Sequence, residues 1–186
     1  MQNKINLIKK KVKQECFDLK NVQAWFYDGH LLEVEKAAKR LLLKLPKANK
    51  DIVMLSVWLH DLQRVRGIKG DHQKIGATEA EKVLKEFSYD DEVIMLVKEA
   101  ILTHSCSNKM PKTLEAKILA TADAMSHYYG NFYLEIALTG KRNLKEYKQW
   151  TKEKLNRDYN EKIFFPFAKK EIKKKHELLM KFFDIK

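Results

Sequence analysis

The feature that most constrains this chain is its most apolar stretch, Ile52 to Leu59, which ends directly in His60 and Asp61. Asp51 precedes it and is the expected N-cap, so the pattern predicts a buried helix with a polar pair at its end. Burying an ionisable group without a partner is costly. We therefore expect the rest of the fold to bring a cation, a donor or water to His60 and Asp61.

The remaining sequence has the same helical character. With six Gly and three Pro among 186 residues, and with 45% apolar residues, the chain suits a helical globular protein. Ser88 is an expected helix cap and Pro166 an expected first helical residue. Apolar residues recur every three or four positions, which predicts helices over residues 5–19, 28–45, 51–61, 71–87, 88–104, 111–130, 131–140, 143–160 and 166–183. We expect an all-α, single-domain helical bundle over residues 1–186, without strands or repeats.

Cysteine content and hydropathy suggest where such a protein works. Cys16 and Cys106 are far apart and form no CxxC motif, so a reducing intracellular setting is the simpler interpretation. No apolar run approaches the roughly eighteen residues needed to cross a bilayer, and no apolar signal core follows the N-terminus. We expect a cytoplasmic protein with no membrane partner.

The net charge of +12 is concentrated at the two ends of the chain. Residues 1–20 hold six lysines against two acids, and residues 141–186 hold fifteen Lys and Arg against seven acids. Residues 21–140 are neutral, so basic residues around a central site would not simply reflect the overall charge. The lysine-rich helices of residues 141–186 usually indicate a solvated face, and the alternative is a weak contact with nucleic acid.

Six residues of the neutral middle have the chemistry of metal ligands. Imidazole and carboxylate groups bind zinc, iron, manganese and similar ions, and helices that share a core bring such groups together. His127 is a weaker seventh candidate, because a helical histidine can simply pack in a core. His176 is expected on the solvated surface, and Trp25, Trp58 and Phe132 in the core. The six candidates are His30, His60, Asp61, His72, His104 and Asp123.

The local sequences around these residues resemble the HD superfamily of metal-dependent phosphohydrolases. The resemblance covers about half of the chain, residues 29–130, and includes an ordered set of motifs rather than the His-Asp pair alone. They are Gly29-His30-Leu31-Leu32-Glu33-Val34, Trp58-Leu59-His60-Asp61-Leu62, His72-Gln73-Lys74-Ile75-Gly76-Ala77, Ala100-Ile101-Leu102-Thr103-His104-Ser105 and the run from Leu114 to Asp123.

The resemblance implies one divalent ion held by His30, His60, Asp61 and Asp123. His72 and His104 fall where some family members bind a second ion, with Asp61 bridging the two. Two ions would lower the pKa of a bound water and neutralise phosphoryl oxygens. With one ion, the two histidines would instead bind phosphate or transfer protons. In either case Asp61, His72 and His104 are the residues expected to take part in catalysis; the identity of the ion, among Mn, Fe, Mg, Ni and Zn, stays open.

Two departures from the family pattern bear on function. Many relatives place acids around the last metal aspartate, whereas Asp123 lies in Thr121-Ala122-Asp123-Ala124-Met125-Ser126-His127, and His127 would substitute for the lost acids. Relatives that hydrolyse guanosine tetraphosphate or deoxynucleoside monophosphates have an acid where this chain has Arg64, which argues against those substrates. The basic residues expected to bind substrate phosphate are Arg64, Arg66, Lys69 and Lys74.

The sequence thus predicts a metal-dependent phosphohydrolase that acts on a phosphomonoester or phosphodiester by attack of a metal-bound water on phosphorus, with a nucleotide as the expected substrate. The alternative is a non-catalytic module of the same fold that binds metal or a nucleotide, with residues 141–186 recruiting nucleic acid. Oligomeric state is not predicted.

Overall fold

A computed structural model describes residues 2–18 and 24–184 of the chain, and these residues form helices without a strand. The expected all-α fold is confirmed. Leu19, the last residue of the first predicted stripe, lies outside the described residues. The helices are α1 (Gln2–Cys16), α2 (Ala24–Phe26), α3 (Leu32–Lys44), α4 (Lys50–Leu59), α5 (Leu62–Val65), α6 (His72–Glu86), α7 (Asp91–Thr103), α8 (Leu114–Tyr129), α9 (Phe132–Leu138), α10 (Leu144–Arg157) and α11 (Pro166–Asp184), with π-helical turns η1 (Tyr27–Leu31) and η2 (Asp158–Lys162).

Helix starts follow local capping chemistry, although two caps differ from those expected. Asn49, not Asp51, caps α4, because its side chain accepts hydrogen bonds from the first free backbone N–H groups. Ser88 is not a cap either: it has a φ of 53°, and α7 begins after Asp90. Pro166 does begin α11, where a residue without an N–H costs no hydrogen bond.

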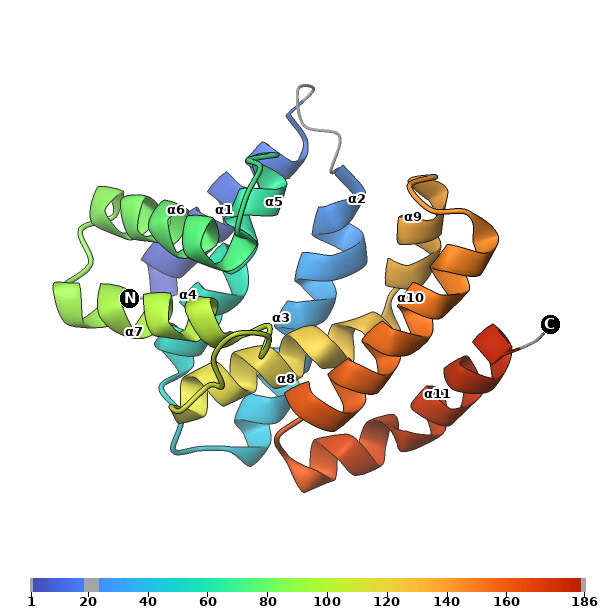
Figure 1. The fold of residues 1–186 in the computed structure, drawn as a ribbon. Helices are drawn as coiled ribbons and strands as arrows, with labels where there is room; N and C mark the ends of the chain where they lie inside the picture. Colours follow the sequence, from blue (N-terminus) through green and yellow to red (C-terminus); the bar gives the residue numbers. More distant parts are fainter. Residues whose placement is uncertain (1, 19–23, 185–186) are drawn as a thin grey trace.

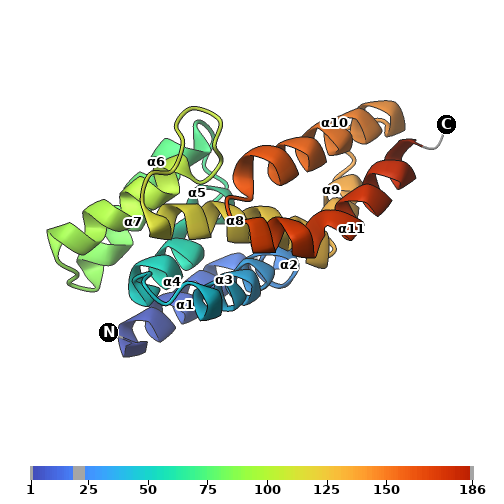
Figure 2. The same cartoon turned by 90° about the horizontal axis from the view of Figure 1, so that it is seen from below.

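Helices α4 and α8 form the centre of the molecule, with α1, α6 and α7 on one side and α9, α10 and α11 on the other (Figures 1 and 2). Helix α4 is apolar all round, and its opposite faces enter two different clusters of buried side chains. Ile52 and Leu55 pack with α1, α6 and α7, whereas Val53 and Val57 pack with α3 and α8. This central position explains why its sequence carries no polar stripe.

The two π-helical turns interrupt otherwise continuous helices. Turn η1 joins α2 to α3 and contains His30, and turn η2 extends α10 as far as Lys162. A π-turn inserts an extra residue into the helical ladder and is frequent at functional sites. Turn η2 contacts α8, and His30 of turn η1 lies 3.2 Å from Ser126 of α8, measured from Nδ1 to Oγ.

Among the described residues, no helix combines the length and the apolar character that would be needed to cross a membrane.

Candidate metal centre

Five histidines form a row of neighbouring rings between the two sides of the molecule. Adjacent ring centroids are separated by 5.4, 5.5, 5.2 and 5.5 Å. Four of the rings are buried, and the ring at the exposed end is half-buried. The order along the row is His127, His30, His60, His104 and His72. The fold therefore brings all five histidines of the predicted set, the weaker candidate His127 included, into one place.

The ends of two helices orient two of these rings in the same way. His60 directly follows α4 and donates through Nδ1 to the carbonyl of Val57 at 2.8 Å. His104 directly follows α7 and donates to the carbonyl of Ile101 at 2.6 Å. The last carbonyls of a helix lack intrahelical partners, so they are ready acceptors for these rings. With Nδ1 protonated, a neutral ring carries its lone pair on Nε2, the atom that a metal ion needs.

The free Nε2 atoms converge on the two aspartates. Asp61 Oδ2 lies 3.6 Å from Nε2 of both His30 and His60. Asp123 Oδ1 lies 3.4 Å from His30, 3.6 Å from His127 and 3.9 Å from His60, measured to Nε2 in each case. These separations are longer than ordinary hydrogen bonds. They are close to the ~3.4 Å between two ligand atoms that each lie about 2.1 Å from one tetrahedral ion.

Two buried polar atoms at this place have no hydrogen-bond partner within residues 2–18 and 24–184. They are His60 Nε2 and Asp61 Oδ1, and of the two Asp61 Oδ1 has an ion-pair partner, Arg64 Nε at 3.3 Å. An orphaned buried polar atom such as His60 Nε2 is rare and calls for an unseen partner. Together with the donor set of imidazole and carboxylate, it shows that the residues present fit a divalent cation.

A second group of possible ligands shares Asp61 with the first. Atoms of Asp61, His72 and His104 lie within 4.8 Å of one another, as do atoms of His30, His60 and Asp61 and atoms of His30, Asp123 and His127. Asp61 thus stands between the two ends of the row, which is the position of a bridging ligand. The geometry offers room for one ion or two.

Charge in this centre is controlled by burial and by neighbouring cations. Burial alone would raise the pKa of Asp61 and Asp123, but His60 and Arg64 beside Asp61, and Lys162 beside Asp123, hold both pKa values well below the usual range. Burial lowers the pKa of His104 to about 3. At neutral pH the centre therefore presents two carboxylates and an uncharged His104 ring, the protonation states in which these groups bind metal.

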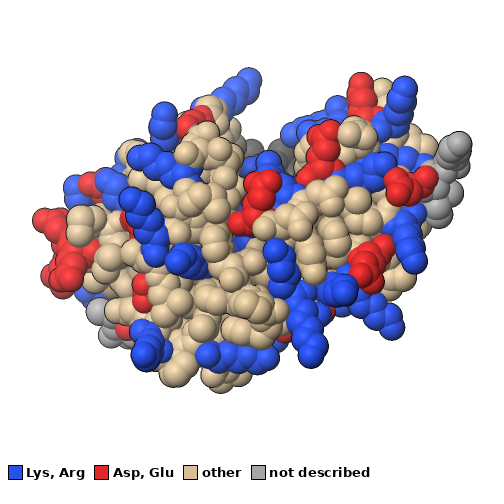
Figure 3. All heavy atoms as spheres, turned by 60° about the horizontal axis from the view of Figure 1, so that its bottom comes forward, with Lys and Arg blue, Asp and Glu red and all other residues tan. Residues whose placement is uncertain are grey.

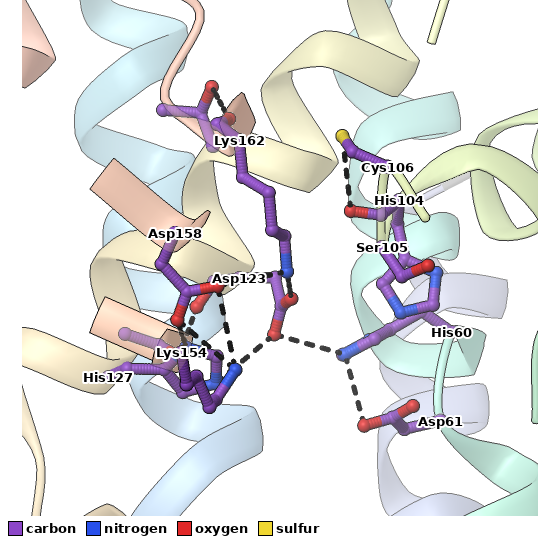
Figure 4. Close-up of polar contacts among 12 residues, drawn as sticks. His60, Asp61, His104, Ser105, Cys106, Asp123, His127, Lys154, Asp158 and Lys162 are labelled. Atoms are coloured by element: carbon purple, nitrogen blue, oxygen red, sulfur yellow. Dashed lines mark hydrogen bonds and ion pairs between the residues drawn. The ribbon is translucent and has the colours of Figure 1, made fainter. Parts of the chain in front are cut away.

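Three charged residues of the centre were not expected from the sequence. Lys162 is buried and hydrogen-bonds to Asp123 Oδ2, while Asp158 accepts from His127 Nδ1 at 2.8 Å and pairs with Lys154 at 3.1 Å (Figure 4). In a lysine-rich segment they look like surface charges. A signal was nevertheless present, because Asp158 and Lys162 continue the three-to-four spacing of the buried residues Tyr147, Thr151 and Leu155.

The structure separates the four basic residues expected to bind phosphate. Arg64 and Lys69 line the cavity above the metal centre. Arg66 does not: its guanidinium is bound by Glu15 at 2.7 and 2.8 Å and by Glu79 at 2.5 Å, which ties α1 and α6 together. Lys74 is exposed, lies 3.6 Å from Asp71, and is not part of the cavity lining. Arg66 and Lys74 thus lie outside the cavity lining, unlike Arg64 and Lys69.

The cavity measures about 730 Å³, and its lining reaches from Asp61 to the C-terminal helices. Five of its basic residues come from the segment 141–162, namely Lys141, Arg142, Lys154, Arg157 and Lys162. The aromatic residues Trp25, Phe26, Phe132 and Trp150 line it too, so Trp25 and Phe132, expected only in the core, reach the site. His176 lies outside this lining and is half-buried, stacked on Tyr159 at 4.3 Å, rather than solvated as expected.

Comparison with curated proteins gives relatives that contain this region within longer chains. The chain is 30% identical over 114 residues to the 3'-5' exoribonuclease YhaM of Listeria welshimeri, which is 52% of this chain and 36% of that protein. The YhaM protein of Bacillus velezensis is 29% identical over 112 residues, or 50% of this chain and 36% of that protein. The chain therefore spans little more than a third of the length of these relatives.

A solved structure and a family model each match a larger share of this chain than the curated relatives do. The crystal structure of a predicted HD superfamily hydrolase from an uncultured Thermotogales bacterium has a TM-score of 0.62 at 20% identity, over 98% of this chain and 88% of that one. The model of the HD domain matches residues 27–127, which begin beside His30 and end at His127. Since this match covers more than half of the chain and includes both the His60-Asp61 pair and Asp123, the chain belongs to the HD domain family.

Proposed function

We propose that the protein is a metal-dependent phosphodiesterase that acts on a nucleotide or on single-stranded nucleic acid. One observation carries the proposal: Nε2 atoms of His30, His60 and His127 converge on the oxygens of Asp61 and Asp123 at the floor of a basic cavity. The HD family and the hydrolase names of the similar proteins support the class of enzyme.

A divalent ion held by these residues would supply positive charge to phosphoryl oxygens and make water a stronger nucleophile at neutral pH. The chain's own contribution is to position the substrate. Arg64 and Lys69 on one wall, and Lys141, Arg142 and Arg157 on the other, would hold phosphates. His72 and His104 would either hold a second ion or move protons at the reacting oxygen.

The shape and lining of the cavity support the choice of substrate. Its volume of about 730 Å³ is ample for a small organic ligand. Basic residues on two walls would neutralise more than one phosphate, and the rings of Trp25 and Trp150 offer surfaces for bases. A nucleotide or a short single strand has both phosphates for the basic residues and bases for the aromatic rings, whereas inorganic phosphate or a sugar phosphate has only the phosphate.

The test compares an aryl phosphodiester with the matching aryl phosphomonoester, and a single-stranded oligoribonucleotide with nucleoside monophosphates, after reloading the protein with Mn²⁺, Zn²⁺ or Mg²⁺. We expect diester cleavage to exceed monoester cleavage. Asp61→Asn should reduce turnover by at least about 100-fold because it removes a ligand carboxylate. The matched control is Asp90→Asn, an exposed aspartate whose side chain makes no capping hydrogen bond. Turnover that survives Asp61→Asn would contradict the proposal.

One observation favours the non-catalytic alternative. Cations of the protein already accompany both aspartates, with Lys162 on Asp123 Oδ2 and Arg64 Nε at 3.3 Å from Asp61 Oδ1. A module that binds a nucleotide without cleaving it would need no positive charge at the two aspartates beyond Lys162 and Arg64. If fully metal-loaded protein binds nucleotides but cleaves none of the substrates above, the binding function is the correct one.

A further inference from the structure

His127 lies in the metal centre although the family pattern assigns no ligand at its position. Its ring stacks on that of His30 at 5.4 Å with an interplanar angle of 7°, and its Nε2 faces Asp123 Oδ1 at 3.6 Å. It follows Asp123 by one helical turn on α8, so both side chains point to the same side of the helix (Figure 4). Packing against Phe132, at 4.0 Å between ring centroids, holds the ring in place.

The other nitrogen of this ring is fixed by a carboxylate from outside the matched region. His127 Nδ1 donates to Asp158 Oδ2 at 2.8 Å, and Asp158 is fully buried. Lys154 at 3.1 Å and Lys162 at 3.7 Å keep Asp158 ionised inside the core. Metal-bound histidines commonly donate their second N–H to a carboxylate in this way, which fixes both tautomer and orientation.

The arrangement is unfavourable unless a cation lies between the two groups. Because Nδ1 carries the proton, Nε2 of the neutral ring presents a lone pair to the Asp123 carboxylate, and the distance is too long for a hydrogen bond. A lone pair that faces an anion in a buried site repels it, and a positive ion between them removes the repulsion.

We propose that His127 is a ligand of the ion held by His30, His60, Asp61 and Asp123, and that Asp158 is the residue that positions it. A third imidazole in the ligand set favours a first-row transition ion such as Zn²⁺, Fe²⁺ or Ni²⁺ over Mg²⁺, which prefers oxygen ligands. This inference rests on the metal site of the proposed function. It adds that turn η2, outside the region matched by the family model, helps to complete the site.

Metal binding by the full chain provides the test, with Co²⁺ as the probe because its absorption spectrum reports the ligand set. His127→Gln should shift the Co²⁺ d–d bands and weaken binding, as measured by titration calorimetry. Asp158→Asn keeps the ligands, so it should preserve the band positions while weakening affinity by about 10–100-fold. The matched control is His176→Gln, which removes a half-buried stacked histidine outside the cavity and should change neither quantity.

Each outcome has a defined meaning. If the unaltered protein binds Co²⁺ but His127→Gln leaves both the bands and the affinity unchanged, His127 is only a packed residue and the inference fails while the proposed function stands. If the unaltered protein binds no Co²⁺, Zn²⁺ or Mn²⁺, both fail.

A measurement on the unaltered chain covers the case in which a variant does not fold. In protein with ¹⁵N-labelled histidines, the His127 ring is identified by its proximity to both the Phe132 and the Tyr133 rings, since His30 contacts Phe132 as well. Saturating Zn²⁺ should shift its Nε2 resonance together with those of His30 and His60, and should leave His176 unaffected. An unshifted His127 Nε2 would overturn the inference.

Discussion

At the scale of single residues, buried neutral histidines link the stability of the metal-free protein to pH. Burial lowers the pKa of His104 to about 3 and that of His127 to about 4, from 6.5. Below pH 6.5 the unfolded chain therefore binds protons on these rings that the folded chain does not bind. Stability present at pH 7 is lost as the pH falls through this range. The carboxylates with lowered pKa values add to this loss only below about pH 4.

We expect the free energy of unfolding in EDTA to fall by at least roughly 4 kcal/mol between pH 7 and pH 5, about 2 kcal/mol for each of these two rings. The lowered pKa values of His30, His72 and His176 add to the fall. Urea denaturation at pH 7, 6 and 5 measures it. His104→Asn removes one of these rings and should reduce the fall between pH 7 and pH 5 by about 2 kcal/mol. An equal free energy of unfolding at pH 7 and pH 5 would show that the rings are not held neutral in the fold.

At the scale of elements, the site depends on how closely α6 approaches the end of α4. A Cβ added to Gly76 would lie 2.9 Å from the carbonyl oxygen of His60, and this neighbour is backbone that cannot rotate away. Gly76 is one turn after His72 on α6. The glycine therefore allows the contact that places His72 near Asp61 and His104.

Gly76→Ala should lower the free energy of unfolding by about 1–3 kcal/mol, because the added methyl group overpacks the interface. It should also weaken binding of a second equivalent of Co²⁺ if that ion uses His72. Gly29→Ala is the control, since its Cβ would meet the Trp25 ring at an ordinary 3.4 Å. The control should be neutral or stabilising by up to about 1 kcal/mol. Equal effects of the two substitutions would mean that the α4–α6 contact does not limit the fold.

The approximate ranges of most helices were predictable from the sequence, because apolar spacing and Pro166 are local signals. The residues at which the helices begin and end were harder to predict. Asn49 and Asp51 are both good caps, and only the position of the chain entering α4 decides between them. The π-turns η1 and η2 were not predicted, because a π-turn is a rare interruption of a helix that the apolar spacing does not reveal.

At the scale of the whole molecule, the basic excess is not continuous over the face seen in Figure 3. On the side seen in Figure 3, lysines and arginines are interspersed with acidic groups and with uncharged surface. The basic residues of segment 141–186 follow one another in the sequence, but in the structure they separate into two groups. Residues of 141–162 line the cavity, whereas the exposed lysines of α11 do not.

This division predicts which charges matter for a nucleic-acid ligand. Replacing Lys141, Arg142 and Arg157 together by Gln should weaken binding of a single-stranded oligonucleotide. It should also reduce the slope of log K against log salt by up to about 2, since each phosphate contact on a single strand contributes about 0.7. Fluorescence anisotropy over a range of salt concentrations measures both quantities.

The matched control removes the same charge from α11, with Lys170, Lys173 and Lys174 replaced by Gln. These lysines are exposed and lie outside the cavity. An equal loss in both triple variants would indicate general attraction to the basic surface, and the cavity would then have no special role in holding the strand.

The sequence by itself determined the helical class, the family and the six central candidates, because helical periodicity and the ordered His and Asp motifs are local in the chain. Only the tertiary structure decided what lies around them. Arg66 and Lys162 are both basic residues near charged partners, yet the fold ties Arg66 to Glu15 and Glu79 and buries Lys162 against Asp123. The physical reason is that the protonation, pairing and orientation of a charged side chain depend on burial and on neighbours from distant segments, which no local pattern contains.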